Sequence, residues 1–167
     1  MQLIEKAAKP MVLDADGLNI LSDQINAMQR MRGPRLLTPH PGEMKRLAGT
    51  EQGTRAEQAR NFCAAHPVTL LLKGSRTIVA ERGQPFSYNT TGNPGMSTGG
   101  MGDVLTGVCA ALIGQKLSLY VAARVGAWVC GRAAEIAIFN GGASEQSLGP
   151  SDVLAHLGAA FKDLAAS

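Results

Sequence analysis

The sequence is poor in aromatic residues and cysteines and contains no long apolar run, and each shortage excludes a class of protein. Aromatic residues make up 4% of the chain while glycine contributes 20 residues, so we expect closely packed helices rich in small side chains. Cys63, Cys109 and Cys130 are odd in number and form no CxxC pair, which argues against a disulfide-linked scaffold and predicts buried thiols in a reducing compartment. No apolar run approaches the roughly 18 residues that a membrane-spanning helix needs.

Charged clusters and targeting signals are missing as well. The net charge is +3 and no run of Lys or Arg is longer than two residues, so we expect no nucleic-acid partner. A mild positive potential would help to attract a phosphorylated substrate, although ordinary surface charge accounts for it equally well. The N-terminal stretch MQLIEKAAKP lacks the apolar core of a secretory signal, and we therefore expect a cytoplasmic protein.

Short apolar runs alternate with helical patterns along the chain. Strands are expected at residues 11–13, 35–38, 68–72, 77–80 and 84–89. Helices are expected at residues 17–31, 41–48, 54–65, 103–114, 118–139 and 150–165. This alternation predicts one α/β domain over residues 1–167, with a mainly parallel sheet flanked by helices and a local antiparallel hairpin.

The strongest local signal is the glycine-rich stretch 92–102, which ends at Asp103 and opens a helical pattern. Glycines let backbone N–H groups converge, and a helix start adds unpaired donors, so the stretch predicts an anion site suited to phosphate. A carboxylate at Asp103 could accept a proton from a hydroxyl that attacks phosphorus. The alternative is a flexible loop followed by an ordinary first-turn acid. The stretch contains no GK[ST] and is therefore not a Walker loop.

Polar side chains also follow the first two predicted strands. Asp14 and Asp16 come directly after residues 11–13, and His40 and Glu43 follow the second strand. Ligands of open α/β sheets collect at the carboxyl ends of strands, where these acids could position a hydroxyl or hydrated Mg²⁺ and His40 could contact substrate. The alternatives are turn formation with helix capping by Asp16, and a rigid turn in which Glu43 is a favourable first-turn acid.

The tip of the predicted hairpin, Lys73 to Thr77, is the fourth candidate segment. A lysine with nearby hydroxyls and exposed N–H groups can hold the phosphates or ribose of a nucleotide, whereas the alternative is a solvated turn. Three of the four segments follow strands and one opens a helix, which is where an α/β fold gathers its site. Their agreement predicts a single site.

The motifs VLDADGLN, TPHPGE, LLLKGSRTIV and NTTGNPGMSTGGMGDVLTG resemble those of the ADP/ATP-dependent NAD(P)H-hydrate dehydratases, the YjeF C-terminal-domain family, from about residue 11 to the end. The resemblance implies a ribokinase-like fold and a metabolite-repair reaction. In that reaction the S epimer of hydrated NADH or NADPH loses water at the expense of ADP or ATP. The hydroxyl is phosphorylated and phosphate is then eliminated, which implies Mg²⁺ as well.

The resemblance also implies roles for single residues. Asp103 matches the catalytic base and a substrate contact. Further substrate contacts are His40 and, less firmly, Asp16 and Asn19. The nucleotide would be bound by Lys73, Gly74, Ser75, Arg76, Thr77 and Gly102. The anion hole would comprise Gly99, Gly100, Met101 and Gly102, and Glu43 would hold the metal through water.

The family domain extends further at its N-terminus than the matching motifs do, so we expect an N-terminally truncated form that corresponds to the C-terminal part of the domain. The resemblance also implies a homo-oligomer, with a tetramer as the form common in the family, and a fused or separate NAD(P)H-hydrate epimerase as partner. The helix expected at 118–139 contains residues that could form a subunit interface or pack in the core, namely Trp128, Ala123, Ala127 and Gly131. A ribokinase-like small-molecule kinase and a non-catalytic nucleotide-binding module are the competing hypotheses.

Overall fold

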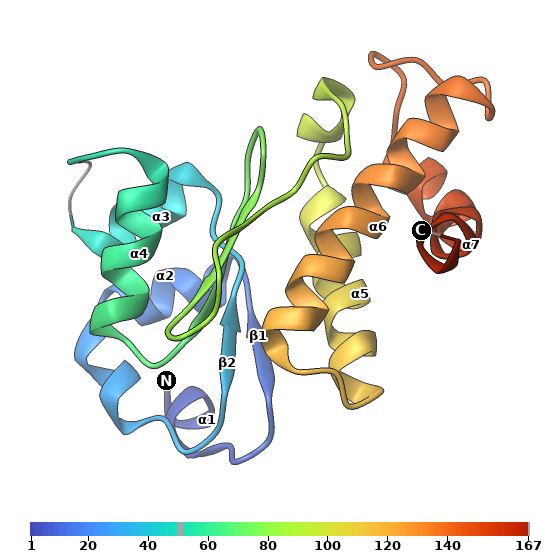
Figure 1. The fold of residues 1–167 in the computed structure, drawn as a ribbon. Coiled ribbons are helices and arrows are strands. Elements are labelled where there is room, and N and C mark those ends of the chain that lie inside the picture. Colours follow the sequence, from blue (N-terminus) through green and yellow to red (C-terminus); the bar gives the residue numbers. More distant parts are fainter. Residues whose placement is uncertain (50–51, 167) are drawn as a thin grey trace.

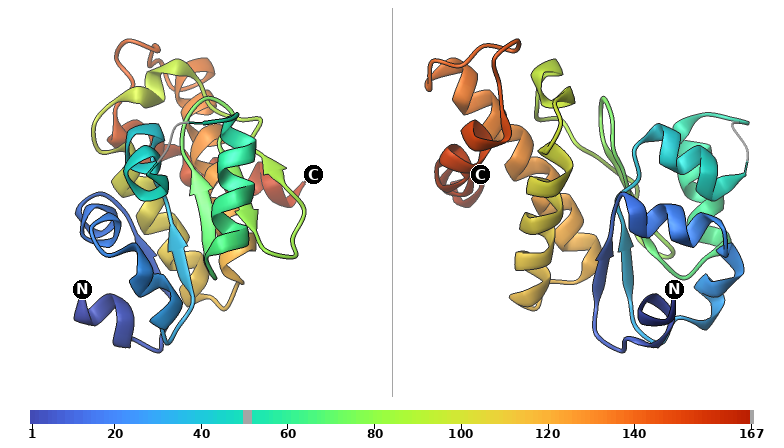
Figure 2. Two further views of the ribbon diagram at one scale, coloured as in Figure 1. Left: turned by 90° about the vertical axis from the view of Figure 1, so that its left-hand side faces the viewer. Right: turned by 180° about the vertical axis from the view of Figure 1, so that it is seen from behind.

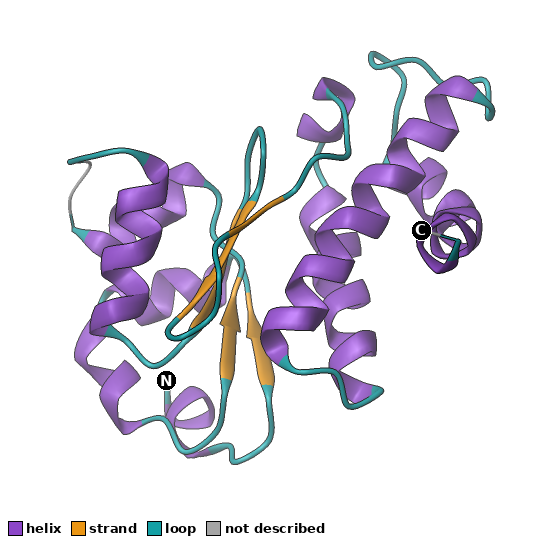
Figure 3. Cartoon of the chain, in the orientation of Figure 1, coloured by secondary structure: helices purple, strands orange, loops and turns teal. Residues whose placement is uncertain are grey.

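The computed structural model describes residues 1–49 and 52–166 of the chain. Within them one five-stranded sheet has its strands in chain order. Figure 3 shows the strands lying between two groups of helices. The strands are β1 (Met11–Leu13), β2 (Arg35–Leu37), β3 (Thr69–Leu72), β4 (Ile78–Glu81) and β5 (Ser87–Tyr88). β1, β2 and β3 pair in parallel, whereas β4 and β5 are added in antiparallel orientation. The predicted α/β class and its antiparallel hairpin are confirmed.

Helices cover both faces of this sheet (Figure 1). One face carries α2 (Asp16–Ser22), α3 (Pro41–Ala48) and α4 (Arg55–Ala65), with the short α1 (Gln2–Lys6) near the N-terminus. The other face carries α5 (Met101–Gly114) and α6 (Leu119–Phe139), and α7 (Pro150–Ala165) packs outside them, as both views of Figure 2 show. Side chains alternate across a strand, so Leu37 and Leu70 enter the core under α2–α4 while Leu36 and Leu71 contact the α5–α6 layer.

The helix predicted at 17–31 is wrong as one element, because the chain breaks it after Ser22. A 3-10 helix, η1 (Ile25–Arg30), follows α2 after two intervening residues. The Ser22 hydroxyl donates to the carbonyl of Asn19 at 2.7 Å, and the Gln24 amide bonds to Leu21 three residues back, which tightens the last turn and ends the helix. The predicted apolar spacing still holds, since Met28 is fully buried.

The small residues of α6 belong to the core. Ala123 is fully buried against the sheet, Ala127 is 6% exposed, and Gly131 lies against the backbone of Thr91. These three residues are therefore not available for the subunit interface that the sequence suggested, and the alternative of core packing is confirmed for them. Trp128 is half-buried and packs beside α7 residues of the same chain. None of the described helices is both long enough and apolar enough to cross a membrane.

Cys63, Cys109 and Cys130 are free and buried, as predicted. Burial raises the pKa of each thiol to about 12, because a thiolate would lose its hydration in the core. The thiolate is the reactive form and is populated only as the pH approaches that pKa. We therefore expect iodoacetamide at mildly alkaline pH to leave the native chain unmodified and to alkylate all three cysteines in denaturant, as read by mass spectrometry. Rapid alkylation of a folded sample would contradict the burial.

Candidate functional site

The glycine-rich stretch leads directly into α5, and the first turn of this helix contains the residues for which the sequence predicts an anion site. Gly100 is the N-cap residue, with a φ of 88° that favours glycine, and no side chain caps the helix. Met101, Gly102 and Asp103 follow as the first three helical residues, whose backbone N–H groups lack partners within the helix. Together with the helix dipole, these donors make the start of α5 attractive to a phosphate group.

A charged cluster lies immediately beneath this helix start. The Lys73 Nζ atom, at the end of β3, is 2.8 Å from Oδ1 of Asp14 at the end of β1 and 3.8 Å from Oε2 of Glu43. The Thr106 hydroxyl of α5 donates to the other Asp14 oxygen at 3.1 Å. A Cβ atom placed on Gly102 would lie 3.3 Å from Asp14 Oδ2 and 3.4 Å from Lys73 Nζ, so glycine allows the helix to approach the cluster closely. The carboxyl ends of the parallel strands and the start of α5 therefore meet in one site.

His40 and Glu43 form the beginning of α3. The His40 Nδ1 atom accepts hydrogen bonds from the amides of Gly42 and Glu43, and the Glu43 carboxylate accepts one from the His40 amide at 2.7 Å. This capping box fixes the imidazole, whose Nε2 atom lies 3.6 Å from Oε1 of Glu43, and 52% of the His40 side chain is exposed. The alternative of Glu43 as a first-turn acid is thus confirmed, His40 is found to cap the same helix, and its side chain stays exposed for a ligand contact.

The β3–β4 turn holds Lys73, Gly74, Ser75, Arg76 and Thr77 in a defined shape. Gly74 has a φ of 133° and Arg76 one of 52°, and the Thr77 hydroxyl donates to the Gly74 carbonyl at 3.2 Å. Gly74, Ser75 and Arg76 are exposed. The turn is therefore both ordered and accessible, as a nucleotide-binding segment requires.

Arg55, at the first position of α4, holds this turn from behind. Its guanidinium donates to the backbone carbonyls of Leu72, Lys73 and Ser75 at 3.1, 2.9 and 2.7 Å. The helix begins there because Thr54 caps it, accepting from the Glu57 amide as the sequence predicted. A planar guanidinium can donate hydrogen bonds to several carbonyls at once in a fixed geometry. The ammonium group of lysine cannot reproduce that geometry.

Replacing Arg55 with lysine is therefore expected to loosen the turn. Each lost hydrogen bond is worth about 1 kcal/mol net, so we expect amide hydrogen exchange in residues 73–77 to accelerate by about tenfold. Arg60→Lys is the matched control, because Arg60 lies on the same helix and its described interactions, with the ring of Phe86 at 5.0 Å and with Glu57, do not involve the turn. Unchanged exchange in the Arg55 variant would contradict this role.

The glycine-rich stretch is anchored to α6. The Thr91 hydroxyl donates to the Trp128 carbonyl at 2.8 Å, and the Gly92 amide donates to Glu135 at 2.8 Å. Asn93 caps the short 3-10 helix η2 (Pro94–Ser97) by accepting from the Gly95 amide. Gly99 and Gly100 are exposed beyond this anchored part. The stretch is therefore held at its base while its tip faces solvent at the upper edge of the sheet in Figure 1.

The contacts that Asp16 and Asn19 make lie outside the charged cluster of Lys73, Asp14 and Glu43. Asp16 is exposed in the first turn of α2 and does not cap it. The Asn19 side chain accepts from Arg46 of α3 at 3.1 Å and is 3.5 Å from Asp16 Oδ1. The structure thus links these two residues to each other and to α3, whereas Asp14 of the same motif points into the cluster.

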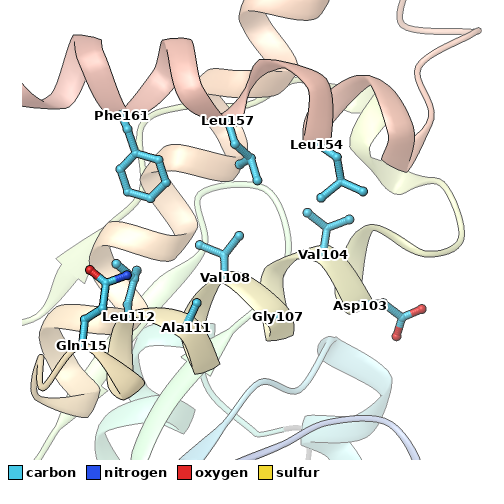
Figure 4. A pocket seen from close by; sticks show the side chains of 10 residues that line it. All are labelled: Asp103, Val104, Gly107, Val108, Ala111, Leu112, Gln115, Leu154, Leu157 and Phe161. Carbon is cyan, nitrogen blue, oxygen red and sulfur yellow. The ribbon is translucent and has the colours of Figure 1, made fainter.

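Asp103 lies at the end of an apolar groove between α5 and α7 (Figure 4). The groove has a volume of about 500 Å³ and is lined mainly by Val104, Val108, Leu112, Leu154, Leu157 and Phe161. Figure 4 shows the Asp103 carboxylate pointing away from these apolar side chains. The side chain is exposed beside the open first turn of α5, where a proton acceptor would be accessible to a bound hydroxyl.

No group of three or more metal-ligating side chains occurs among the described residues. Asp14 and Glu43 are two carboxylates on either side of Lys73. Mg²⁺ keeps several waters and binds through one or two carboxylates together with substrate phosphates, so two acids beside an anion site fit that mode. The water-mediated role of Glu43 remains a prediction.

Sequence reasoning missed two residues of this site and gave a third no partner. It noted Asp14 only as one of two acids after a strand, and it did not consider Arg55 or Thr106. The partners of Asp14, Lys73 and Thr106, are 59 and 92 residues away in the sequence, and no local sequence pattern predicts contacts over such separations. The position of Asp14 immediately after an apolar strand was the one available signal.

Comparisons with known proteins agree with this arrangement. A family model described as NAD(P)H-hydrate dehydratase matches residues 1–153. An ADP-dependent (S)-NAD(P)H-hydrate dehydratase from Neisseria meningitidis is 41% identical over 140 residues, covering 80% of this chain and 47% of the relative. A bifunctional NAD(P)H-hydrate repair enzyme from Moorella thermoacetica is 45% identical over 138 residues, covering 80% of this chain and 26% of the relative.

A solved structure gives the same result for the fold. The ADP/ATP-dependent NAD(P)H-hydrate dehydratase of Bacillus subtilis, co-crystallised with ATP and Mg²⁺, superposes with a TM-score of 0.81 at 28% identity and covers 96% of this chain. This chain spans 57% of that structure and about half or less of the two curated relatives. The ribokinase-like fold and the family expected from the motifs are both confirmed. The chain belongs to the NAD(P)H-hydrate dehydratase family.

Proposed function

We propose that this chain supplies the nucleotide site and the catalytic base of an ADP- or ATP-dependent NAD(P)H-hydrate dehydratase, as the C-terminal part of that domain. The observation that carries the proposal is the meeting of Lys73 and the open first turn of α5 at Gly102, next to Asp103. An ammonium group and unpaired backbone donors favour a phosphate group at this point. The neighbouring carboxylate can remove a proton from an attacking hydroxyl.

The proposed chemistry turns a poor leaving group into a good one. Asp103 takes the proton of the ring hydroxyl as its oxygen attacks the terminal phosphorus of the nucleotide, and the shortened nucleotide leaves. The carbon–oxygen bond of the phosphorylated intermediate then breaks, phosphate departs, and loss of a ring proton restores the conjugated nicotinamide. The amides of Gly99, Gly100, Met101 and Gly102 would stabilise charge on the transferred phosphoryl group, which is where such donors contribute most.

The other residues have supporting roles in this proposal. The turn from Lys73 to Thr77 and Gly102 bind the nucleotide, and His40, Asp16 and Asn19 contact the hydrated cofactor. Mg²⁺, held by the nucleotide and through water by Glu43, would offset the negative charge of the phosphates. A cytoplasmic location, a homotetramer and cooperation with an NAD(P)H-hydrate epimerase complete the proposal, and these rest on the resemblance of the motifs.

The test is incubation of the chain with S-NADH hydrate or S-NADPH hydrate, Mg²⁺ and either ADP or ATP. We expect the absorbance of reduced nicotinamide to return in step with the release of free phosphate, and the R epimer is the control substrate. Phosphate retained on the organic product would identify a small-molecule kinase instead. Binding of nucleotide without turnover, also in a longer chain that includes the remaining part of the relatives' domain, would identify a non-catalytic nucleotide-binding module.

A further inference from the structure

Asp14 takes no part in the chemistry proposed above, yet its side chain links the end of β1 to both the end of β3 and the first turns of α5. Its two carboxylate oxygens contact Lys73 at 2.8 Å and Thr106 at 3.1 Å. Only 13% of its side chain is exposed, against 19% for that of Lys73. The Lys73–Asp14 ion pair is short and partly shielded from solvent. Such a pair restricts both side chains more than a solvent-exposed ion pair does.

We propose that Asp14 is a positioning residue that holds the Lys73 ammonium under the first turn of α5, with Thr106 fixing the Asp14 carboxylate. This inference rests on the proposed nucleotide site. Lysine is a flexible point charge with several rotatable bonds, so an unrestrained Lys73 would spread over many positions. Two contacts, from Lys73 to Asp14 and from Asp14 to Thr106 of α5, instead place its charge beside the Gly102 end of the helix.

Positioning and simple electrostatics predict opposite effects of removing the Asp14 charge. If Asp14 were only a negative charge near a phosphate site, its neutralisation would strengthen nucleotide binding, because like charges repel. If it positions Lys73, the same change weakens binding, because the ammonium loses its fixed place. The direction of the change therefore decides between the two.

The experiment is calorimetric titration of the chain and its variants with ADP and Mg²⁺. We expect Asp14→Asn to weaken ADP binding by about tenfold, an effect of the size of one charge-assisted hydrogen bond. Asp23→Asn is the matched control, because it removes the same charge from an exposed residue after α2 that forms no ion pair among the described residues. It should bind ADP as the wild type does.

A double-mutant cycle then tests whether Asp14 acts through Lys73. We expect Asp14→Asn to have no further effect on ADP affinity in a Lys73→Met background, whereas independent roles would give additive losses. Thr106→Val covers the case in which Asp14→Asn fails to fold, because it keeps the side-chain shape and removes only the hydroxyl. It should weaken ADP binding several-fold, and Thr106→Ser should restore it.

The outcomes separate this inference from the proposed function. Wild-type ADP affinity in Asp14→Asn and Thr106→Val, or tighter binding in Asp14→Asn, would overturn the positioning role while leaving the nucleotide site intact. Additive losses in the cycle would overturn the action through Lys73. A wild-type chain that binds no ADP would overturn the proposed nucleotide site itself, and the inference would fall with it.

Discussion

Asp103→Asn is expected to lower the rate of NAD(P)H-hydrate dehydration by about a thousandfold, within the range that general-base catalysis contributes. Asparagine has nearly the shape of aspartate but cannot accept the hydroxyl proton. Asp103 is exposed and occupies the third position of α5, so its replacement leaves the anchored base of the glycine-rich stretch untouched. We therefore expect ADP affinity to stay near the wild-type value while turnover is lost.

Asp152→Asn is the matched control for this substitution. Asp152 occupies the same third position at the start of α7, where its carboxylate accepts from the Gly149 amide at 2.8 Å. Its loss should cost about 1 kcal/mol of stability as a lost helix cap and leave turnover nearly unchanged. If Asp103 were only a favourable first-turn acid, both variants would show this small loss of stability and neither would lose activity. Coupled assays of nicotinamide absorbance, together with urea unfolding, measure the two effects.

The largest expected loss of stability follows from Gly131→Ala. A Cβ atom at this position of α6 would lie 2.7 Å from the carbonyl carbon of Thr91 and 2.8 Å from its oxygen. The Thr91 hydroxyl would be closer still, and it cannot turn aside without losing its hydrogen bond to the Trp128 carbonyl of the same helix, while the Thr91 backbone has no freedom to rotate away. We expect the overpacking to lower the free energy of unfolding by about 2–3 kcal/mol, although alanine is the better helix former by about 1 kcal/mol.

Gly158→Ala provides the opposite expectation in the same experiment. Gly158 lies within α7, and a Cβ atom there would meet no described atom within 4 Å. Only the helix propensity changes, so this variant should be more stable by about 0.5–1 kcal/mol. Urea titrations followed by circular dichroism measure both variants. Gly131→Ala should also weaken ADP binding because it displaces the base of the glycine-rich stretch, and wild-type stability in this variant would contradict the close approach.

The sequence predicted the elements well where local periodicity determines them. All five strands occur within the expected ranges apart from single residues at their ends, and the capping box of Thr54 and Glu57 forms as expected. The single helix at 17–31 failed, because apolar spacing alone does not distinguish a continuous helix from a helix followed by a 3-10 turn. For the side of α6 that meets Thr91 the sequence left core and interface open, since small residues suit both equally well.

For the site, the sequence predicted which segments meet but not how they hold one another. Fold rules place the residues after β1, β2 and β3 at one edge, and the start of α5 joins them there. The contacts of Arg55 with the β3–β4 turn and of Thr106 with Asp14 depend on how helices from distant parts of the chain pack against the sheet. The resemblance of the motifs does not predict these contacts either. It assigns roles to the matching residues but not to the residues that hold them in place.

The order of the strands has a consequence for how the chain acquires its structure. Each strand pairs with its immediate predecessor and successor in the chain, so the sheet can grow by short loop closures without waiting for later segments. The Asp14–Thr106 contact instead joins residues that are 92 positions apart in the chain, and it forms only when α5 packs against the sheet. During refolding we therefore expect an ordered sheet to form first. The nucleotide site at the start of α5, and with it the affinity for ADP, should form late.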